Sequence, residues 1–375
     1  MWLEATTLSE AGHDVTIICP ATQSFPDKRE RLEGIQIHRF AVKEGRSPLG
    51  LAVEFLVGFT SVSFRYLVLR AKGPIAVLHV CNPPEIYWPL GLLARATGTR
   101  FVFDHHDLSP EMYRAKFKRG PDLVYRALLF LERRTYRSAN AVITTNESYR
   151  EIVTARTGTP PEIATIVRSG PSVARFQKHE PDLTLRRGSE HLMVFLGEIG
   201  EQDGVETLIQ VAAVLRERGV DVHTLVIGDG PALQSTQELA DRLGVAGHCT
   251  FAGRVSDDDQ LSRMLSSADV GVVPDPNTDW SRHSTMNKVM EYMFFGLPVA
   301  AFDLIETRFS AQGAALYARP DDIDDLASVT QRLLEDPELR VAMGQVGEDR
   351  LHEELSWEHS VPELLGLYRR LLAST

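Results

Sequence analysis

The sequence has few cysteines, no excess of basic residues and no long uncharged hydrophobic run. The three cysteines, Cys19, Cys81 and Cys249, are far apart, which excludes a disulfide framework and zinc-ligand spacing and favours a reducing compartment. The formal net charge of −11 excludes a nucleic-acid groove as the main site, because such grooves need concentrated lysine and arginine. Hydrophobic residues make up 43% of the 375 residues, as in a soluble globular protein, and the length predicts about two domains.

No signal peptide or comfortable membrane span is visible. The first residues, MWLEATTLSEAG, lack a basic start followed by an apolar core. The most apolar long segment, 49–69, contains Glu54 and Arg65 and is too polar to span a bilayer easily. We interpret it as a packed helix, with a position on a membrane surface as the alternative. We therefore expect a cytoplasmic protein, with peripheral contact at the inner face of the membrane as the open alternative.

The chain opens with a helical pattern instead of a strand. Trp2, Ala5 and Leu8 share one helical face, Gly12 ends the pattern, and a strand at 13–19 follows. An α/β domain normally opens with a strand and a glycine-rich turn. Either the first strand is absent from the native protein or the start codon was assigned too late. We favour the late start, because the sheet would otherwise lose a buried strand.

Short apolar runs then alternate with helical patterns. In the first half we expect strands at 35–40, 75–80, 100–104, 141–145 and 163–167, and helices at 48–71, 87–97, 122–138 and 148–157. In the second half we expect strands at 192–197, 222–228, 249–253, 270–274, 297–302 and 315–318, and helices around 208–215 and at 231–243, 257–267, 323–335 and 359–372. Gly170, Pro171 and the polar run 178–189 indicate a linker between the halves.

This alternation predicts an α/β fold with two doubly wound, Rossmann-like domains facing a cleft. We place the first domain at residues 1–180, incomplete at its start, and the second at 181–354. Residues 355–375 form a last, broadly apolar helix.

The most informative stretch is DWSRHSTMNKVMEYMFFGLPVAAFD (279–303). It predicts a loop, a helix that begins at the hydroxyl cap Ser284 or Thr285 and ends near Gly296, and a buried strand. The first turn offers Asn287 and Lys288 where helices usually carry acidic residues. Free amides beside a lysine predict a site for an anion such as phosphate.

Glu291, one turn further along this helix, can accept hydrogen bonds from a pair of sugar hydroxyls. A phosphate on the helix start and a diol on this carboxylate together describe a nucleotide. The alternative is that Lys288 and Glu291, three residues apart, form a surface ion pair.

Polar groups also follow several predicted strands, at the edge where α/β sheets bind ligands. Asp104-His105-His106-Asp107 follows one strand and His79 ends another. A metal site or a plain polar loop are alternatives at 104–107, but adjacent ligands rarely all point inward, so we expect no metal. Arg254 follows the strand 249–253 and faces either the cleft or solvent. Gly197-Glu198-Ile199-Gly200 is a weak nucleotide-binding signal because the third glycine is missing.

These segments resemble retaining glycosyltransferases of the family-4 type, which have the GT-B fold. The resemblance covers nearly the whole chain. It is carried by FLGEIGEQDGVETLI (195–209), LVIGDGP (225–231), CTFAGRV (249–255), ADVGVVP (268–274) and STMNKVMEYMFFGLPVAAFD (284–303), and in the first half by FVFDHHDLSPEMY (101–113) and NAVITTNES (140–148). It implies that the second domain binds a nucleotide-sugar donor, the first binds the acceptor, and the last helix crosses back to the first domain.

The resemblance also implies roles for individual residues. The family has two glutamates separated by seven residues, and Glu291 matches the second of them. In the family this second glutamate holds the ribose hydroxyls. The amides of Ser284, Thr285 and Met286 lie where the diphosphate and donor sugar bind. His106 matches the histidine that ends an acceptor-domain strand.

Three features depart from the family pattern. The first glutamate of the motif falls at His283, and the usual basic pair falls on Glu198 and Asp203. Lys288, with Arg254 or Arg282, is our candidate for the missing positive charge. The glycine-rich loop after the first strand is also missing, which agrees with a late start.

We therefore predict a retaining, nucleotide-sugar-dependent glycosyltransferase that builds a surface polysaccharide on a glycan or lipid-linked acceptor. His106, Lys288 and Glu291 would be the catalytic groups, and neither a metal nor a further cofactor would be needed. One alternative is a nucleotide-sugar 2-epimerase of the same fold, with acid-base roles for Glu85, Asp107 and Glu111. The other is an inactive fragment with exposed sheet edges.

Overall fold

The computed structural model describes residues 1–22, 25–43, 45, 48–117 and 122–373, and it divides into two compact units. Unit 1 comprises the described parts of 1–114, 119–168 and 360–375. Unit 2 comprises 169–359 with a short piece of chain at 115–117. The chain thus leaves unit 1 before the predicted linker run 178–189 and returns to it at Ser360.

Unit 2 is built on one continuous sheet. The strand order is β10-β9-β8-β11-β12-β13, and all neighbouring strands are parallel. The strands are β8 His191–Leu196, β9 Val222–Ile227, β10 Cys249–Gly253, β11 Val270–Val273, β12 Val299–Phe302 and β13 Ala315–Ala318. The helices are α7 Val205–Glu217, α8 Leu233–Arg242, α9 Asp258–Ser266, α10 Asn287–Phe294, α11 Ile305–Ala311, α12 Ile323–Glu335 and α13 Pro337–Arg350.

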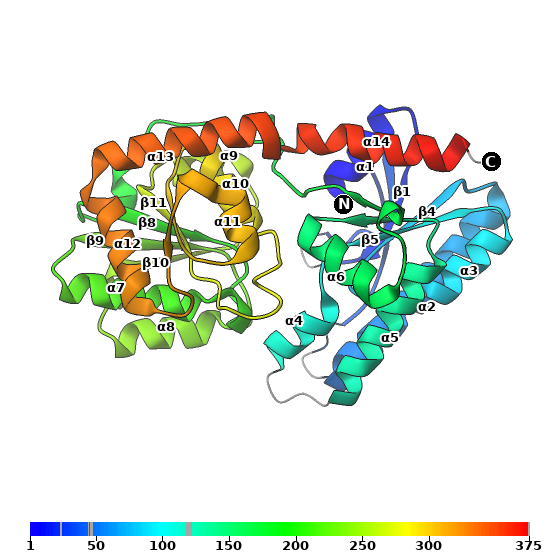
Figure 1. Cartoon of the computed structure of the whole chain (residues 1–375), viewed down its shortest axis with the longest axis horizontal. Helices are drawn as coiled ribbons and strands as arrows, with labels where there is room; N and C mark the ends of the chain where they lie inside the picture. The colour runs from blue at the N-terminus through cyan, green and yellow to red at the C-terminus, as the bar shows by residue number, and fades with distance from the viewer. Residues whose placement is uncertain (23–24, 44, 46–47, 118–121, 374–375) are drawn as a thin grey trace. The chain divides into compact units, whose positions relative to one another are not determined.

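Helices cover both faces of this sheet (Figure 1). Successive residues of β8 point to opposite faces, as in any strand. Leu192 and Val194 join a core with α9 and α10, whereas Met193 and Phe195 join a core with α7 and α12. This double burial explains the nearly uninterrupted apolar runs from which the strands were predicted.

Unit 1 contains two separate sheets. One has the order β1-β3-β2, with β1 Thr16–Pro20 parallel to β3 Ile35–Phe40 and β2 Arg29–Leu32 antiparallel to it. The other is parallel, with the order β4 Val77–Cys81, β5 Arg100–His105, β6 Ala141–Thr144 and β7 Ala164–Ile166. The helices are α1 Trp2–Glu10, α2 Pro48–Lys72, α3 Trp88–Ala96, α4 Ser109–Lys116, α5 Asp122–Ser138 and α6 Glu147–Thr157, with most of α14 Trp357–Ala373.

Several elements were not expected from the sequence. The polar strand β2 and the helices α4, α11 and α13 had no strong apolar periodicity. In α13, Gly344 and Gly347 argue against a helix, yet Gly344 is needed for packing. A Cβ on Gly344 would lie 2.1 Å from the carbonyl oxygen of Gly296. Three helices, not two, therefore follow β13.

Helix α2 packs by one face only. Tyr66 is buried, whereas the opposite face exposes an apolar stripe consisting of Leu49, Val53, Leu56, Phe64, Leu67 and Val68. By length and composition Ala52–Lys72 is the only helix of the described chain that could cross a membrane, and 11% of its apolar window is buried. The expectation of a packed helix is thus confirmed for one face and wrong for the other.

Candidate active site

The carboxyl ends of four strands of unit 2 meet at one edge of the sheet. Gly197, Gly228 and Arg254 follow β8, β9 and β10, and Asp275 follows β11 after one proline. A Cβ on Gly228, whose φ is +152°, would lie 1.8 Å from the carbonyl oxygen of Gly197. Only glycine permits this approach, and the resulting edge is where open α/β sheets bind ligands.

Lys288 brings a buried positive charge to this edge. Its Nζ lies 3.1 Å and 3.3 Å from the two carboxylate oxygens of Asp275 and 4.5 Å from the ring centroid of Phe195. The side chain also passes Gly197, because a Cβ there would lie 3.4 Å from Lys288 Cε. The alternative of a surface ion pair between Lys288 and Glu291 is therefore wrong.

Glu291 occupies a different environment on the same helix. Its side chain is 16% exposed, and the nearest cation is Arg175, whose Nη1 lies 3.9 Å away. That guanidinium is hydrogen-bonded to Asp258 at 2.8 Å. Burial raises the pKa of Glu291, while Arg175 and Lys288 oppose that rise. A desolvated carboxylate of this kind gains from hydroxyl donors.

The helix begins later than the sequence predicted. α10 starts at Asn287 with Met286 at its N-cap, and no side chain caps it. The Ser284 hydroxyl donates to the carbonyl of Trp280 at 2.8 Å, and the Ser284 amide donates to Ser281 at 3.4 Å. The predicted hydroxyl cap is therefore wrong, because Ser284 belongs to the preceding turn.

The remaining residues predicted for the donor site lie at or beside the start of α10. The first turn of α10 contains no acidic residue, and Asn287 is exposed. The first amides of an α-helix, here those of Asn287 and Lys288, have no intrahelical acceptor. Met286 is buried and Thr285 is partly exposed. The amino end of α10 thus combines a positive helix dipole with the Lys288 charge.

Arg254 and Arg282 are both exposed. Neither has an ion-pair partner among the residues that the structure describes. Arg254 directly follows the carboxyl end of β10, whereas Arg282 lies in the turn before α10, where its carbonyl accepts from the Glu306 amide at 3.1 Å. The structure therefore leaves both guanidinium groups available.

The turn after β8 is acidic. Asp203 accepts from the Gly200 amide at 3.0 Å and from Gln202 Nε2 at 2.9 Å. Burial raises the pKa of Asp203 to about 7; Lys288 opposes this rise, and Asp275 and Glu198 add to it. A single proton on Asp203 therefore changes the charge of this turn near neutral pH.

Unit 1 assembles a second polar cluster at the carboxyl end of β5. Buried Asp104 Oδ2 lies 2.8 Å from His106 Nε2 and 3.2 Å from His79 Nε2, and it accepts from Cys81 Sγ at 2.9 Å. The other nitrogen of His79 lies 2.8 Å from the hydroxyl of Tyr368 on α14. Asp104 raises the pKa of His106 against the effect of its burial. The structure thus brings together the two predicted strand-end histidines.

The carboxylates proposed for an epimerase are in different situations. Glu85 is buried and accepts from Asn82 Nδ2 at 2.7 Å, and burial raises its pKa. Glu111 is held by Arg156 at 2.6 Å and by the hydroxyl of Tyr125 at 3.1 Å. Asp107 is partly exposed, and its amide donates to Asn82 Oδ1 at 3.2 Å. Glu85 and Glu111 therefore act as structural partners, which weakens the epimerase alternative.

Two family models match the chain, one in each half. Residues 4–170 match the glycosyl transferase 4-like domain and residues 190–336 match the glycosyl transferases group 1 family. The chain is a glycosyltransferase. The prediction of a retaining enzyme that uses a nucleotide-sugar donor is thereby confirmed.

Relatives of this glycosyltransferase match over nearly its full length. The 2-deoxystreptamine glucosyltransferase of Streptomyces kanamyceticus is 24% identical over 97% of this chain and 96% of its own length. This coverage gives no support to the expectation of a missing first strand, which stays a prediction.

Solved structures show the same fold. Sucrose-phosphate synthase from Thermosynechococcus elongatus superposes with a TM-score of 0.80 at 20% identity, covering 99% of this chain and 92% of that one. Anabaena Alr3699/HepE, solved in complex with UDP, superposes with a TM-score of 0.70 at 14% identity, covering 100% and 95%. The expected GT-B fold, with a parallel-sheet Rossmann-like domain in each half, is therefore confirmed.

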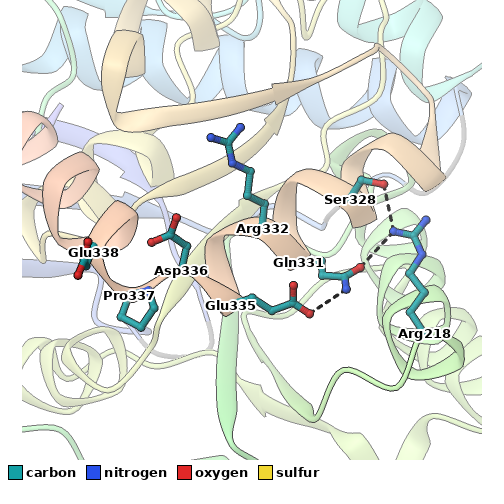
Figure 2. Close-up of a pocket in the computed structure, with 8 residues that line it drawn as sticks. All are labelled: Arg218, Ser328, Gln331, Arg332, Glu335, Asp336, Pro337 and Glu338. Atoms are coloured by element: carbon teal, nitrogen blue, oxygen red, sulfur yellow. Dashed lines mark hydrogen bonds between the residues drawn. The ribbon is translucent and has the colours of Figure 1, made fainter.

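A surface recess of this glycosyltransferase lies elsewhere (Figure 2). It is about 640 Å³ and is lined by side chains including Arg218, Gln331 and Glu335. Arg218 donates to Ser328 at 3.0 Å, and Gln331 donates to Glu335 at 2.8 Å. Arg218 lies between the end of α7 and the start of β9, so the recess opens at the amino ends of the strands. No predicted donor-site residue lines it.

One group of side chains in the glycosyltransferase has the geometry for a metal ion. Glu4, Cys81, Asp104 and His106 each offer a ligand atom, and these atoms lie within 4.8 Å of one another. The expectation that no metal takes part stays a prediction.

The sequence did not single out Asp275 or Arg175. Asp275 directly follows a predicted strand, so the strand-end rule that selected Asp104 could have found it. Arg175 lies in the predicted linker and reaches α10 only through tertiary packing, so no local pattern marks it.

Proposed function

We propose that the donor diphosphate binds at the amino end of α10 and on Lys288, and that Glu291 holds the ribose hydroxyls. The observation that carries this proposal is the buried Lys288 at the carboxyl edge of the sheet, beside a helix start that has no acidic residue. Helix amides and a buried cation stabilise an anion far better than a solvated lysine does. Arg254 and Arg282 supply further positive charge in place of the family's usual basic pair, whose positions are occupied here by Glu198 and Asp203.

The transfer step follows from this arrangement. The bond between the sugar and the diphosphate breaks, and the acceptor hydroxyl oxygen forms a new bond on the same face of the sugar while its proton passes to the leaving diphosphate. Negative charge accumulates on the leaving diphosphate, so Lys288 exchanges part of its contact with Asp275 for the diphosphate. His106 of unit 1, whose pKa the neighbouring Asp104 raises, orients the acceptor group.

A transfer assay with the 375-residue chain and a panel of UDP-, GDP-, ADP- and dTDP-sugars tests the donor site. We expect one nucleotide sugar to give transfer that EDTA does not change. Transfer lost in EDTA and restored by a divalent cation would contradict the metal-independent mechanism. Incubation without acceptor separates the epimerase, which would interconvert the donor sugar and release no nucleoside diphosphate.

We further propose that the acceptor is a glycan or lipid-linked intermediate of a surface polysaccharide, at the cytoplasmic face of the membrane. The exposed apolar stripe of α2 supports this, because soluble proteins rarely expose large apolar patches without a partner. Arg70 and Lys72 at the end of the helix add charge that attracts anionic headgroups.

Flotation with vesicles of phosphatidylcholine and phosphatidylglycerol tests the membrane contact. Phe64 and Leu67 are 67% and 48% exposed, so replacing both by serine is expected to abolish flotation without loss of fold. Leu243→Ser, at an exposed position of unit 2, is the matched control. If all three proteins stay at the bottom of the gradient, the membrane contact is wrong, and the donor site is unaffected.

A further inference from the structure

One buried amide side chain connects the loops that follow β4 and β5. Asn82 comes directly after β4 and is 5% exposed. Its Oδ1 accepts from the backbone amides of His106 at 2.6 Å and of Asp107 at 3.2 Å. Its Nδ2 donates to the carbonyl of Asp107 and, at 2.7 Å, to Oε1 of Glu85. All four residues belong to unit 1, and Asn82 therefore uses both its acceptor and its donors there.

These bonds hold the backbone that carries His106. Asp104 lies in β5, and His106 is the first residue beyond the end of that strand. Residues two apart in an extended chain point to the same side, so His106 faces Asp104 only while the chain stays extended past the strand. In that position Nε2 of His106 lies 2.8 Å from Oδ2 of Asp104. The ladder between β5 and β6 ends at His105, so the strand pairing does not fix the backbone at His106.

We propose that Asn82 is a positioning residue for His106, because its carbonyl oxygen holds the amides of residues 106 and 107 and thereby keeps the imidazole beside Asp104. This inference rests on the proposed role of His106 in transfer, since the place of the imidazole matters only if it takes part. Asn82 is uncharged and acts through the backbone. A displacement of about 1 Å at a reacting group can lower a rate by about 10²-fold, so the effect is measurable.

An asparagine at the other end of β5 provides a matched control. Oδ1 of Asn140 accepts from the amide of Phe101 at 2.9 Å, at the amino end of the strand. Asn140→Leu therefore removes a bond between a side chain and the backbone of β5, as Asn82→Leu does, but far along the strand from His106. A purely structural role of Asn82 predicts the same consequences for both variants.

Amide hydrogen exchange in the unaltered chain provides the first test. The amides of His106 and Asp107 should exchange at least about tenfold more slowly than in an unstructured peptide, because both are bonded to Asn82. This measurement does not depend on the folding of any variant. Exchange of both amides at the rate of an unstructured peptide would overturn the proposal.

Steady-state kinetics of the two leucine variants provide the second test. Leucine has nearly the size of asparagine and no polar atom. Asn82→Leu should lower kcat by about tenfold with the donor KM changed less than about twofold, because the donor site is in unit 2. Asn140→Leu should keep kcat within about twofold of the wild type. Unchanged kcat in the Asn82 variant, or an equal loss in both variants, would overturn the proposal.

A double-mutant cycle separates this inference from the proposed function. Once His106→Ala has removed the imidazole, adding Asn82→Leu should cause no further loss of kcat, because nothing remains to be positioned. A further loss of about tenfold would show that Asn82 acts independently of His106, and only the positioning role would be wrong. If His106→Ala alone left kcat unchanged, the proposed role of His106 would be wrong, and the inference would fall with it.

An exchange of donor and acceptor provides the rescue. In the double variant Asn82→Asp with Glu85→Gln, one carboxylate oxygen still accepts from the amides of residues 106 and 107, and the new amide donates to the other oxygen. The carbonyl of Asp107 keeps the bond from the Ser109 amide at 3.0 Å. We expect kcat within about threefold of the wild type, because the two backbone amides keep their acceptor. A folded double variant as slow as Asn82→Leu would overturn the proposal, and this result decides if Asn82→Leu does not fold.

Discussion

Unit 2 places its candidate site within a short stretch of chain, whereas unit 1 assembles its polar cluster from distant elements. Lys288 and Glu291 are three residues apart on α10, and Asp275 lies 13 residues before Lys288. In unit 1, His79, Asp104 and Tyr368 come from β4, β5 and α14, with 289 positions between the first and the last. The donor site is thus local in sequence, and the histidine cluster is a product of the tertiary fold.

The two units also differ in the continuity of their sheets. Unit 2 has six strands in one parallel sheet, while unit 1 has three and four strands with a cavity between them. We infer that the two units divide the work. Changes in unit 2 should alter the use of the donor, and changes in unit 1 should alter turnover with donor affinity preserved. Four substitutions test this division.

Lys288→Met is expected to have the largest effect. The charge that stabilises the leaving diphosphate is lost, so kcat/KM for the donor should fall by about 10²- to 10³-fold, as when one transition-state donor is removed. Initial rates at saturating acceptor measure this. A loss below threefold would contradict the assignment of Lys288.

The same substitution leaves Asp275 buried without its cation, which can cost about 3–5 kcal/mol of stability. The double variant with Asp275→Asn removes that buried charge. We expect it to recover the unfolding temperature but not the activity. Joint recovery of both would show that Lys288 serves the fold alone.

His106→Ala is expected to lower kcat by about 10- to 100-fold with the donor KM changed less than twofold. Because the pKa of His106 is raised, the imidazole stays protonated above pH 6.5, and kcat should fall as pH rises through that raised value. The contribution of the Asp104–His106 pair to the free energy of unfolding is fully present below pH 6.5 and is lost as pH rises through the raised pKa of His106. The variant should show no such fall.

His359→Gln, at an exposed histidine of unit 2, is the matched control and should leave the pH profile unchanged. A rise in donor KM in the His106 variant, with kcat preserved, would break the proposed division between the units.

Glu291→Gln should raise the donor KM by about tenfold, because hydrogen bonds to a charged group contribute about 1.5–3 kcal/mol. The change in kcat should be smaller. Isothermal titration with the nucleoside diphosphate product of the active donor measures the same loss without turnover. Glu238→Gln on the exposed face of α8 is the control. Unchanged donor affinity in the Glu291 variant would remove the basis of the donor-site assignment.

The sequence predicted the architecture well because buried parallel strands have a strong apolar signal. It also placed Lys288 and Glu291, since both lie in one segment whose spacing is readable. It could not predict that Lys288 turns to Asp275 or that Arg175 approaches Glu291, because these contacts depend on packing. The helix start was misplaced because Ser284 bonds to Trp280, a choice that no local pattern reveals.

Asp203→Asn should have the smallest effect, and this effect should depend on pH. Since burial raises the pKa of Asp203 to about 7, the wild-type turn gains a negative charge between pH 6 and 8. One added charge near the diphosphate costs about 1 kcal/mol in a well-solvated site, so donor KM should rise about threefold to fivefold over that range. The variant should keep its low KM, because asparagine still accepts from the Gly200 amide.

The free energy of unfolding should also depend on the titration of Asp203. The folded chain binds more protons than the unfolded chain between the ordinary pKa of an aspartate, 3.8, and about 7, so the free energy of unfolding should fall as pH rises through this window. Asp203→Asn should remove that part of the decline. Glu198→Gln removes an exposed charge of the same turn and should lower donor KM equally at pH 6 and 8. If Glu198→Gln abolished the pH dependence and Asp203→Asn did not, the titrating group would be Glu198, and the buried aspartate would have only a structural role.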